Sequence, residues 1–359
     1  MATPKTTIWE CAPHTHAKHI LLEKYLKAWF PILGRHNERV IYIDGFAGPG
    51  EYSKGEKGSP LVVLDVAKSH TANLTGELCF YFVENDSNRF DHIKSVIEQN
   101  VYPTNFKIDT ALGEFADILE ADLNSFDATG AKNAPIFAFI DPFGFSGVPY
   151  DLLKRLLILP KTEVFVYFAR SSVNRFLDND KVEHHMRELF GTDIVEFPGG
   201  PDRLNKLKIF YESRLKQAAK FVGSFTMADN NGTPIYDLFF ASNNALGYVK
   251  MKEAMWAVDE SGGFRFSDKD NPNQSALFKH DPLPPLIQLI VDRGRKRKGI
   301  NVDKIETFVC NETIYLTKHM KAALKHLEES GMISVQPIKL NGDRRRGKFF
   351  SPGTVIDFA

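Results

Sequence analysis

The stretch RVIYIDGFAGPGEY, from Arg39 to Tyr52, joins an apolar run to a glycine-rich turn. The apolar run ends at Asp44, and three glycines follow within six residues. A glycine-rich turn directly after a strand lets the backbone approach a ligand closely. The sequence therefore leaves open whether this turn binds a phosphate, a dinucleotide, another molecule or no ligand.

Four short apolar runs, this one included, predict strands. They are residues 39–44, 78–84, 135–141 and 163–169, and a weaker run lies at 105–109. Runs without polar alternation are typical of strands that are buried on both faces, as in a parallel sheet. An amphipathic helix at 14–33 precedes them, and helical spacing separates them. This order indicates an open, doubly wound α/β sheet of the Rossmann type.

The rest of the chain predicts three further segments. Residues 171–232 look mostly helical and charged and are interpreted as an insertion, and a strand at 236–243 and a helix at 247–259 then complete a first domain, residues 1–259. Residues 260–285 are polar and rich in Gly and Pro, which predicts a linker. Residues 286–359 read as three helices followed by a β-hairpin, which suggests a winged helix-turn-helix domain.

Composition places the chain among ordinary globular proteins. It has 359 residues, enough for two domains, with 43% apolar and 25% charged residues. Cys11, Cys79 and Cys310 are far apart, so we expect neither a metal site nor a disulfide framework, and a reducing cytoplasm. We expect no membrane partner, because no apolar run approaches the roughly 20 residues that span a bilayer and the first residues lack a signal-peptide pattern.

Charge is unevenly distributed although the formal net charge is zero. Residues 281–359 carry 14 Lys and Arg against 9 Asp and Glu, a net +5, so the preceding residues carry −5. Such asymmetry suggests that the tail binds a polyanion. Solvated surface charge is the alternative.

Several interpretations compete for the turn from Asp44 to Gly50. A phosphate-binding loop requires G-x-x-x-x-G-K-[ST], but Glu56 stands where the lysine belongs and would repel phosphate. A dinucleotide fingerprint requires G-x-G-x-x-G, and GPGEYS ends in a serine. S-adenosylmethionine has a cationic sulfonium, which suits the acid at the strand end and the close backbone approach at Gly48 and Gly50. A tight turn without a ligand is the remaining interpretation.

Two further strand ends carry chemistry beside this turn. In FVEND the second strand ends at Glu84, and an acid at that place accepts hydrogen bonds from ribose hydroxyls in nucleotide-binding folds. The fourth strand ends in IDPFGFSG. Asp141 there is suited to accept the N–H groups of a base amine, and Phe143 to stack on a flipped-out base. A solvated acid and a Pro-Gly turn with a core Phe are the plain alternatives.

The motifs YIDGFAGPG, FVEND and IDPFG resemble the first, second and fourth motifs of class I S-adenosylmethionine-dependent methyltransferases. Over nearly its full length the chain resembles the bacterial three-Cys-motif partner proteins (TcmP). These share the opening HTHAKHILLEKYLKAW, the loop DGFAGPGEY and a terminal winged helix with a basic RRRGKF wing. The family is named for cysteines in a genomically linked protein that resembles radical S-adenosylmethionine enzymes. The resemblance implies a Rossmann-like methyltransferase fold, S-adenosyl-L-methionine as cofactor and such a protein as partner.

The resemblance also implies roles for single residues. The cofactor-binding residues are expected to be Asp44, Phe46, Ala47, Gly48 and Gly50 for the methionine part, Glu84 for the ribose, and Glu114 and Phe115 for the adenine, with Asp109 as a rival to Glu114. Asp141, Pro142 and Phe143 would be catalytic, and their single proline resembles the Asp-Pro-Phe-Gly of tRNA guanine dimethylases, which favours RNA. His14, Thr15 and Lys18, from the opening motif, and Tyr52, after the glycines, are expected near the substrate or are simply solvent-facing.

In the basic tail, the expected nucleic-acid contacts are Arg344, Arg345, Arg346 and Lys348 on the wing and Lys318 and Lys321 on the third helix. The favoured hypothesis is an N-methyltransferase that acts on an exocyclic base amine of nucleic acid, RNA before DNA. The alternatives are a non-catalytic accessory module for the three-Cys-motif partner, and a methyltransferase for a small molecule or a protein.

Overall fold

The computed structural model describes residues 6–70, 74–129, 134–144, 148–192, 200, 202–268, 281–295, 297–345, 347 and 349–359. The chain divides into two compact units. Unit 1 comprises Met1–Val258 and Phe264–Gln274, and unit 2 comprises Asp259–Gly263 and Ser275–Ala359. No helix in the described ranges is long and apolar enough to cross a membrane.

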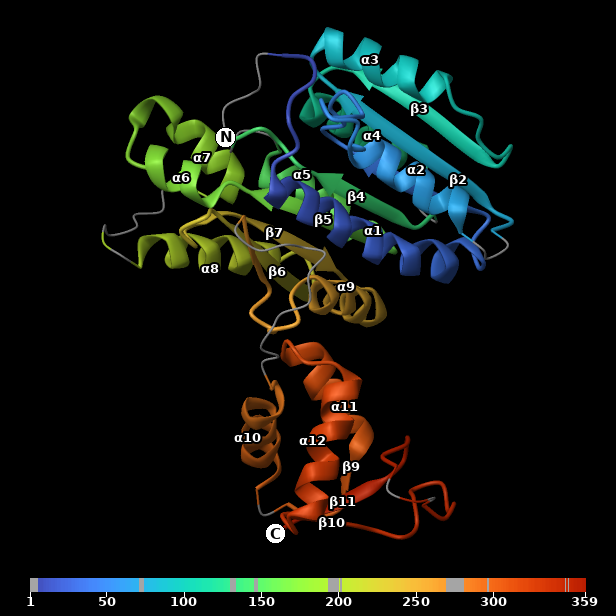
Figure 1. The fold of residues 1–359 in the computed structure, drawn as a ribbon, viewed down its shortest axis with the longest axis vertical. Coiled ribbons are helices and arrows are strands. Elements are labelled where there is room, and N and C mark those ends of the chain that lie inside the picture. Colours follow the sequence, from blue (N-terminus) through green and yellow to red (C-terminus); the bar gives the residue numbers. More distant parts are fainter. Residues whose placement is uncertain are drawn as a thin grey trace. The chain divides into compact units, whose positions relative to one another are not determined.

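Unit 1 is a mixed α/β unit built on one large sheet with the strand order β3-β2-β1-β4-β5-β7-β6-β8 (Figure 1). Its strands are β1 (Arg39–Asp44), β2 (Glu77–Glu84), β3 (Phe106–Leu112), β4 (Ile136–Ile140), β5 (Thr162–Phe168), β6 (Phe221–Ala228), β7 (Pro234–Ser242) and β8 (Arg265–Ser267). The first five are parallel, and β7 runs antiparallel to β5 and β6. The five apolar runs of the sequence thus form the parallel part of the sheet.

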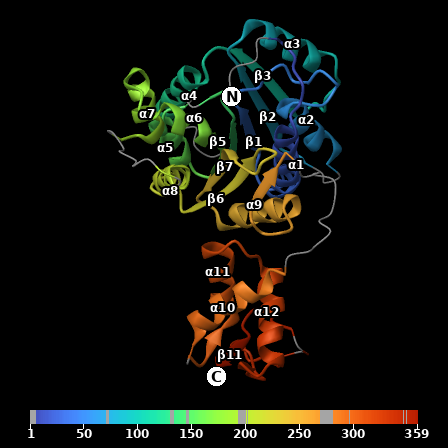
Figure 2. The same cartoon turned by 60° about the vertical axis from the view of Figure 1, so that its left-hand side comes forward.

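Nine α-helices of unit 1 surround the sheet (Figure 2). They are α1 (Pro13–Gly34), α2 (Ser59–Ser69), α3 (Ser87–Glu98), α4 (Phe115–Thr129), α5 (Tyr150–Ile158), α6 (Arg170–Phe176), α7 (Glu183–Phe190), α8 (Arg203–Leu215) and α9 (Ala245–Val258), with a 3₁₀ turn at Asp180–Val182. α1 packs against α2 and α9, whereas α5 packs against α4 and α7. This count covers the described residues.

Both faces of the sheet are buried because successive side chains of a strand point to opposite sides. On one face Tyr42 stacks on Phe137, and the Phe137 ring contacts aromatic side chains of α1. Ile43, Val83 and Ala138 belong to the core on the other face, with α4, α5 and α7. Unbroken apolar runs are therefore the sequence pattern that these strands require.

Strand order reverses between β1 and β4, since β2 and β3 follow on one side and β5 on the other. In open α/β sheets, ligands bind beyond the carboxyl ends of the strands at this switch point. The loops after Asp44 and Ile140 both lie there.

The structure corrects the expected insertion and linker. Residues 171–232 hold α6, α7 and α8, but they also hold β6, which pairs with β7 in the main sheet. β6 is only partly buried, and Gly223, Ser224 and Thr226 interrupt its apolar pattern, so the sequence signal was weak. Within the expected linker, β8 pairs with β6.

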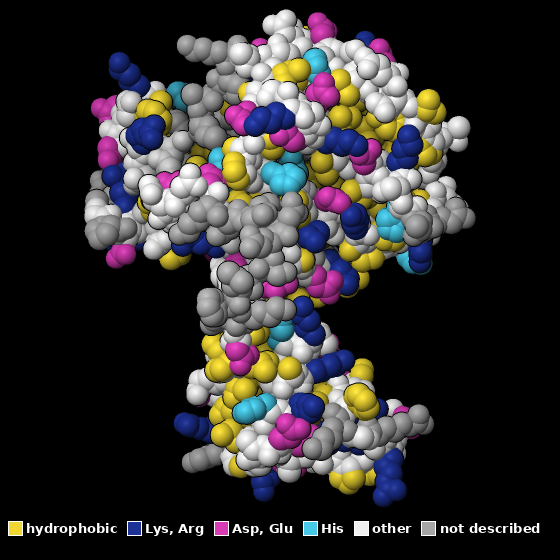
Figure 3. Space-filling view, in the orientation of Figure 1, with side chains coloured by type: hydrophobic (Ala, Val, Ile, Leu, Met, Phe, Trp, Pro, Cys, Tyr) yellow, Lys and Arg dark blue, Asp and Glu magenta, His cyan; other side chains and the backbone are white. Residues whose placement is uncertain are grey.

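Unit 2 contains α10 (Leu283–Gly294), α11 (Val302–Glu312), α12 (Thr317–Glu329) and a three-stranded antiparallel sheet with the order β10-β11-β9. Its strands are β9 (Ile300–Asn301), β10 (Ile333–Val335) and β11 (Val355–Phe358). α12 buries Met320, Ala323, Leu324 and Leu327, one face of the helix. On the face of unit 2 in view in Figure 3, Lys and Arg side chains are spread among apolar and acidic ones.

The hairpin expected within residues 332–350 is only partly present. β10 pairs with β11, and around Asn341-Gly342 the described residues form one isolated bridge, between Ile338 and Arg344. Ile338 and Leu340 are exposed, whereas Val355 and Ile356 are buried. Burial therefore selects the later segment as the strand that pairs with β10.

Candidate functional site

A cleft of about 170 Å³ lies at the carboxyl edge of β1 and β4. Its wall combines the opening of α1, the glycine turn and the loop after β4. Of the residues singled out in the sequence, it contains Thr15, Lys18, Phe46, Ala47, Gly48, Gly50, Tyr52, Asp141, Pro142 and Phe143. The structure thus brings the first and fourth motifs into one site.

The glycine turn is held on both neighbouring strands. Gly45 N donates to Phe139 O of β4 at 3.0 Å, and Ala47 N donates to Val83 O of β2 at 2.8 Å. Gly48 and Gly50 have φ of +63° and +87°, values that L-residues with a Cβ rarely adopt. The turn therefore needs these two glycines for its conformation.

Asp44 is completely buried beneath the turn and does not line the cleft. Its Oδ1 accepts from Phe46 N at 3.2 Å, while Oδ2 has no hydrogen bond of normal geometry among the described residues. Burial raises the pKa of Asp44 to about 7, against the opposing effects of the Ser59 hydroxyl and the Phe46 N–H. Near pH 7 the carboxyl group of Asp44 is therefore only partly ionised.

Glu84 at the end of β2 is also buried, and it binds the glycine turn directly. One carboxylate oxygen accepts from Gly48 N at 2.8 Å and the other from Asp86 N at 2.9 Å. Burial raises its pKa, although both N–H groups and Arg89 favour the charged form. Glu84 therefore fixes the turn and stands outside the wall of the cleft.

Glu114 and Phe115, the expected adenine contacts, are also outside the cleft wall. Glu114 is exposed and accepts from Asn85 Nδ2 at 3.0 Å. The Phe115 ring packs under Gly45, where a Cβ would come within 2.7 Å of it. The rival Asp109 pairs with Tyr81 in mid-strand, away from the carboxyl edge.

Lys18 and Asp141 form an ion pair across the cleft. Lys18 Nζ donates to Asp141 Oδ2, and the Lys18 side chain is only 6% exposed. The pair links α1 to the loop after β4, two segments that the sequence treats separately. Among the described residues, no hydrogen bond occupies Asp141 Oδ1, so this oxygen can still accept from a ligand.

Trp9, which the sequence reading missed, covers the glycine turn. Its ring lies 5.5 Å from that of Phe143 and 5.8 Å from that of Tyr52, both edge to face. The Arg89 guanidinium lies 5.1 Å from the Trp9 ring and 5.4 Å from the Phe143 ring. The segment is held by Ser53 N, which donates to Trp9 O at 2.9 Å. Phe143, the expected stacking platform, is thus already in contact with Trp9.

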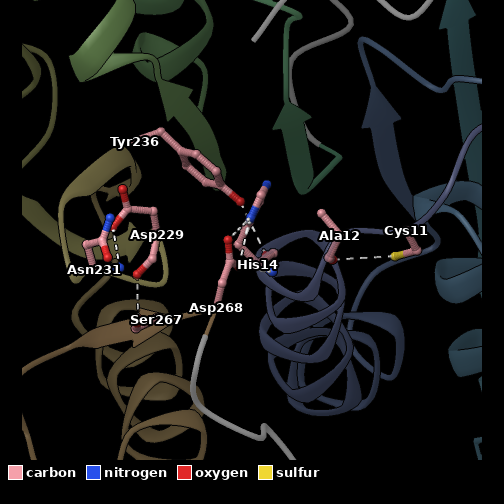
Figure 4. A network of polar contacts seen from close by, with 8 residues as sticks. All are labelled: Cys11, Ala12, His14, Asp229, Asn231, Tyr236, Ser267 and Asp268. Carbon is pink, nitrogen blue, oxygen red and sulfur yellow. Dashed lines mark hydrogen bonds and ion pairs between the residues drawn. The ribbon is translucent and has the colours of Figure 1, made fainter.

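His14 lies behind the cleft wall, where it joins α1 to the end of β8 (Figure 4). Its Nδ1 lies 2.9 Å from Asp268 Oδ1, which also accepts from His14 N at 3.0 Å. Tyr236 OH donates to His14 O at 3.3 Å. The buried His14 Nε2 has no partner among the described residues. These contacts anchor the first turn of α1, the helix that carries Thr15 and Lys18.

His19, Ser59 and Tyr167 complete the wall without having been predicted as site residues. Burial and the neighbouring Lys18 lower the pKa of His19 to about 3, so its imidazole is neutral. Lys18 and His19 were visible in the opening motif, but Trp9 stands in a segment without periodicity. No local pattern identifies such a residue, because its role comes from a long-range contact.

In unit 2, the expected nucleic-acid contacts fall into three groups. Lys318, Lys321 and Arg344 are exposed. Arg345 makes two bonds to Glu328, at 2.6 and 2.9 Å, and its guanidinium lies 5.0 Å from the Phe350 ring centroid. Its charge is therefore used inside the unit. Arg346 and Lys348 lie outside the described residues.

Comparison with known proteins gives weak similarities only. No protein-family model and no curated protein matches the chain. Among solved structures, Trm1 from Pyrococcus horikoshii with S-adenosyl-L-methionine has 12% identity and a TM-score of 0.38, with 100% of this chain and 94% of that chain covered. An O-methyltransferase from Bacillus cereus in complex with SAH has 16% identity and a TM-score of 0.33, with 62% and 80% covered. The METTL16 MTase domain has 14% identity and a TM-score of 0.31, with 60% and 66% covered. Because these TM-scores are low, conclusions about this chain rest on the geometry of its cleft.

Proposed function

We propose that the chain is an S-adenosylmethionine-dependent N-methyltransferase that acts on nucleic acid in the cytoplasm, RNA before DNA. The observation that carries this proposal is the arrangement at the switch point of the sheet. An acid ends β1 and β2, and a third acid, Asp141, directly follows β4. Asp44 is buried beneath the glycine turn, Glu84 accepts from Gly48 N of the turn, and Asp141 lines the cleft. Such a site favours a ligand that carries a positive charge and a backbone-bound polar part.

The residues present suit this cofactor. S-adenosylmethionine supplies, when bound, a methyl group on a cationic sulfonium. Asp141, whose Oδ1 has no partner among the described residues, is the acid at the cleft that a cation could approach, and Asp44 is buried beneath the turn. Apart from its chain neighbours, the described atom within 4 Å of the place where Gly48 lacks a Cβ belongs to the Trp9 ring, at 3.8 Å, so the backbone there is open to close approach.

We assign the cofactor contacts as follows. Phe46, Ala47, Gly48 and Gly50 would hold the methionine part, and Asp44 would act through the turn above it. Glu84 would accept from the ribose, with its orientation fixed by the N–H groups of Gly48 and Asp86. Glu114 and Phe115 stay assigned to the adenine end, supported only by their position after β3.

Asp141 is the proposed catalytic residue. Its Oδ1 would accept an N–H of the base amine, which draws electron density toward the nitrogen, while Lys18 holds Oδ2. Pro142 would shape the loop, and Phe143 would contact the base after Trp9 moves aside. Thr15, Tyr52 and Lys18 line the same cleft and would meet the substrate, with His14 behind them as an anchor.

Unit 2 is proposed to be a winged helix domain that binds nucleic acid. Three helices and a small antiparallel sheet support this assignment, together with the exposed Lys318 and Lys321 on α12 and Arg344 near the turn. Arg346 and Lys348 remain proposed contacts from their place in the sequence. Arg345 would position the wing through Glu328.

The test is a methyl-transfer assay with labelled cofactor against total RNA, DNA and protein. We expect label in RNA, and its loss in Asp141→Ala, with the exposed Asp151→Ala as the matched control. Label only in protein or small molecules would favour a methyltransferase that acts on a protein or a small molecule.

A non-catalytic role has one observation in its favour. Lys18 already neutralises Asp141, and Trp9 already contacts Phe143, so the loop after β4 is engaged without a substrate. Under this alternative the chain would assist a radical-S-adenosylmethionine-like three-Cys-motif partner. Cofactor binding without any labelled acceptor, with that partner present, would support it.

A further inference from the structure

Unit 2 contains a cavity of its own, and its lining includes no residue of α12 or of the turn at Asn341-Gly342. It has a volume of about 490 Å³, within the range of roughly 300–1,000 Å³ that is typical of ligand pockets. We call it the α10–α11 pocket because α10, α11 and the loop between them form most of it. Its apolar part comprises Ile290, Ile305, Phe308 and Phe358.

Four basic side chains stand around this apolar part: Arg293, Arg297, Lys298 and Lys304. All four are exposed. Arg293 has a partner in Glu312 at 3.3 Å. Among the described residues, Arg297, Lys298 and Lys304 form no ion pair, so no described acid neutralises these three positive charges at the pocket.

Hydrogen bonds fix the backbone of the loop between α10 and α11 at Arg297 and Gly299. Arg297 N donates to Gly294 O at 2.9 Å, and Arg297 O accepts from Phe358 N of β11 at 3.0 Å. Gly299, at φ +68°, donates to Asp357 Oδ1 at 2.6 Å. At Gly294 a Cβ would come within 2.3 Å of the Phe358 ring, so close packing closes the base of the pocket.

Arg293 adds a planar group to the rim. Its guanidinium lies 4.1 Å from the centroid of the Phe308 ring. Guanidinium planes stack on unpaired bases, and aromatic and apolar surfaces accept bases of any sequence. A ligand that fits this pocket therefore has a planar or apolar part and several negative charges.

We propose that the α10–α11 pocket binds a nucleotide of a single-stranded nucleic acid. The base would enter the apolar part beside Arg293, and the flanking phosphates would contact Arg297, Lys298 and Lys304. An acidic protein segment has the charge but lacks the planar group, so the nucleic acid is favoured. The proposal builds on the proposed nucleic-acid function but concerns residues other than those of α12 and the wing.

The first experiment measures binding of the full chain to a fluorescent single-stranded oligouridylate by anisotropy over a range of salt concentrations. Lys304→Glu and the double variant Arg297→Ala with Lys298→Ala are compared with Lys154→Glu, an exposed lysine of α5 in unit 1. We expect the pocket variants to lose about tenfold or more in affinity. The slope of log K against log salt should fall by about 0.7 for each lost phosphate contact. Lys154→Glu should leave both unchanged.

The second experiment locates the contact. Oligouridylate that contains 4-thiouridine is cross-linked to the full chain, and the modified peptides are identified by mass spectrometry. We expect cross-links in residues 290–308, and their loss when Lys304→Glu is used.

The results separate this proposal from the proposed function. If Lys318→Ala with Lys321→Ala abolishes binding and the pocket variants bind normally, the pocket proposal is wrong and the winged-helix assignment stands. If single strands do not bind at all, or if polyglutamate competes as well as oligouridylate, the pocket proposal is also wrong. Loss in the pocket variants, in the absence of methyl transfer, would support the pocket and contradict the enzyme.

Discussion

Lys18 occupies an unusual position for a charged residue, because its side chain is almost fully buried and its amino group binds Asp141. A buried charge is tolerated only with such a partner. The pair holds the carboxylate of Asp141 toward α1 and leaves its second oxygen available. Lys18 is therefore expected to position the residue that accepts the substrate amine.

Replacement of Lys18 tests this role. A hydrogen bond to a charged group contributes about 1.5–3 kcal/mol, so Lys18→Met should lower the methyl-transfer rate about 10- to 100-fold. Lys24→Met, on an exposed face of the same helix, is the matched control. Single-turnover kinetics give the rate, and calorimetry gives the cofactor affinity, which should change little. An equal loss in both variants would contradict a role for the Lys18–Asp141 pair.

The raised pKa of Asp44 predicts that the stability of the protein depends on pH. Burial raises its pKa from 3.8 to about 7, so between these values the folded state keeps a proton that the unfolded state has lost. The stabilisation by this proton is present below about pH 4 and is lost as pH rises toward about 7. Asp44→Asn cannot ionise. At about pH 8 it should therefore have a higher free energy of unfolding than the wild type, by an amount on the order of 4 kcal/mol, and a higher unfolding temperature. At about pH 4 the two should unfold at the same temperature.

Thermal unfolding followed by circular dichroism at several pH values measures this difference. The exposed Asp151→Asn controls for loss of one negative charge. A difference between Asp44→Asn and the wild type that is the same at every pH would mean that Asp44 does not titrate as described.

The segment that carries Trp9 restricts the cleft. The cleft measures about 170 Å³, below the roughly 300–1,000 Å³ of typical ligand pockets. Trp9 contributes to that restriction, since it lies against Gly48, Phe143 and Arg89. Binding of the cofactor is therefore expected to displace the Trp9 ring.

Fluorescence can detect this displacement because the chain has only three tryptophans. Addition of S-adenosylmethionine should change the emission of the wild type and of Trp256→Phe, but not of Trp9→Phe. The affinity of Trp9→Phe, measured by calorimetry, shows that the variant still binds. An emission change that persists in Trp9→Phe would show that another tryptophan reports binding and that Trp9 stays in place.

The buried ion pair between Arg170 and Asp237 joins α6 to β7. Arg170 Nε lies 2.9 Å from Asp237 Oδ2, and both residues are at most 2% exposed. Thr226 of β6 also donates to Asp237, at 2.6 Å. Lys208 Nζ also lies 3.4 Å from Asp237 Oδ1. Loss of Arg170 therefore leaves the buried carboxylate partly compensated and costs less than the about 3–5 kcal/mol of an unpaired buried charge.

Arg170→Met should therefore lower the free energy of unfolding by about 1–3 kcal/mol, as measured by urea denaturation. Arg175→Met, exposed on the same helix, should cost less than about 0.5 kcal/mol. The double variant Arg170→Met with Asp237→Asn should recover part of the loss. If Arg170→Met is as stable as Arg175→Met, the Arg170–Asp237 pair does not anchor α6 to the sheet.

These elements show what the sequence could predict. β1 and the other parallel strands were predictable because burial on both faces demands an unbroken apolar run. β6 was not, because it is only partly buried and polar residues interrupt its pattern. Asp141 and Lys18 were both named from the sequence, but their ion pair was not predicted, because it joins two segments that are far apart in the chain. Contacts between distant segments, such as Trp9 with Phe143, leave no local pattern.

The chain combines one unit that has a cleft at the switch point of its sheet with another that carries exposed basic side chains. Each unit is a separate body of contacts, so variants in one should leave ligand binding by the other unchanged. This separation lets the cofactor proposal be tested without any nucleic acid. The central claim is that the glycine turn binds S-adenosylmethionine.

The direct measurement is isothermal titration calorimetry of S-adenosylmethionine with the full chain, Gly48→Val and Gly55→Val. Both glycines have positive φ, +63° and +83°, so both variants carry similar backbone strain. Only Gly48 lines the cleft, and Gly55 has no atom within 4 Å of its missing Cβ. We expect one binding event for the wild type and for Gly55→Val, and none for Gly48→Val. No binding to the wild type, or equal binding by both variants, would contradict it.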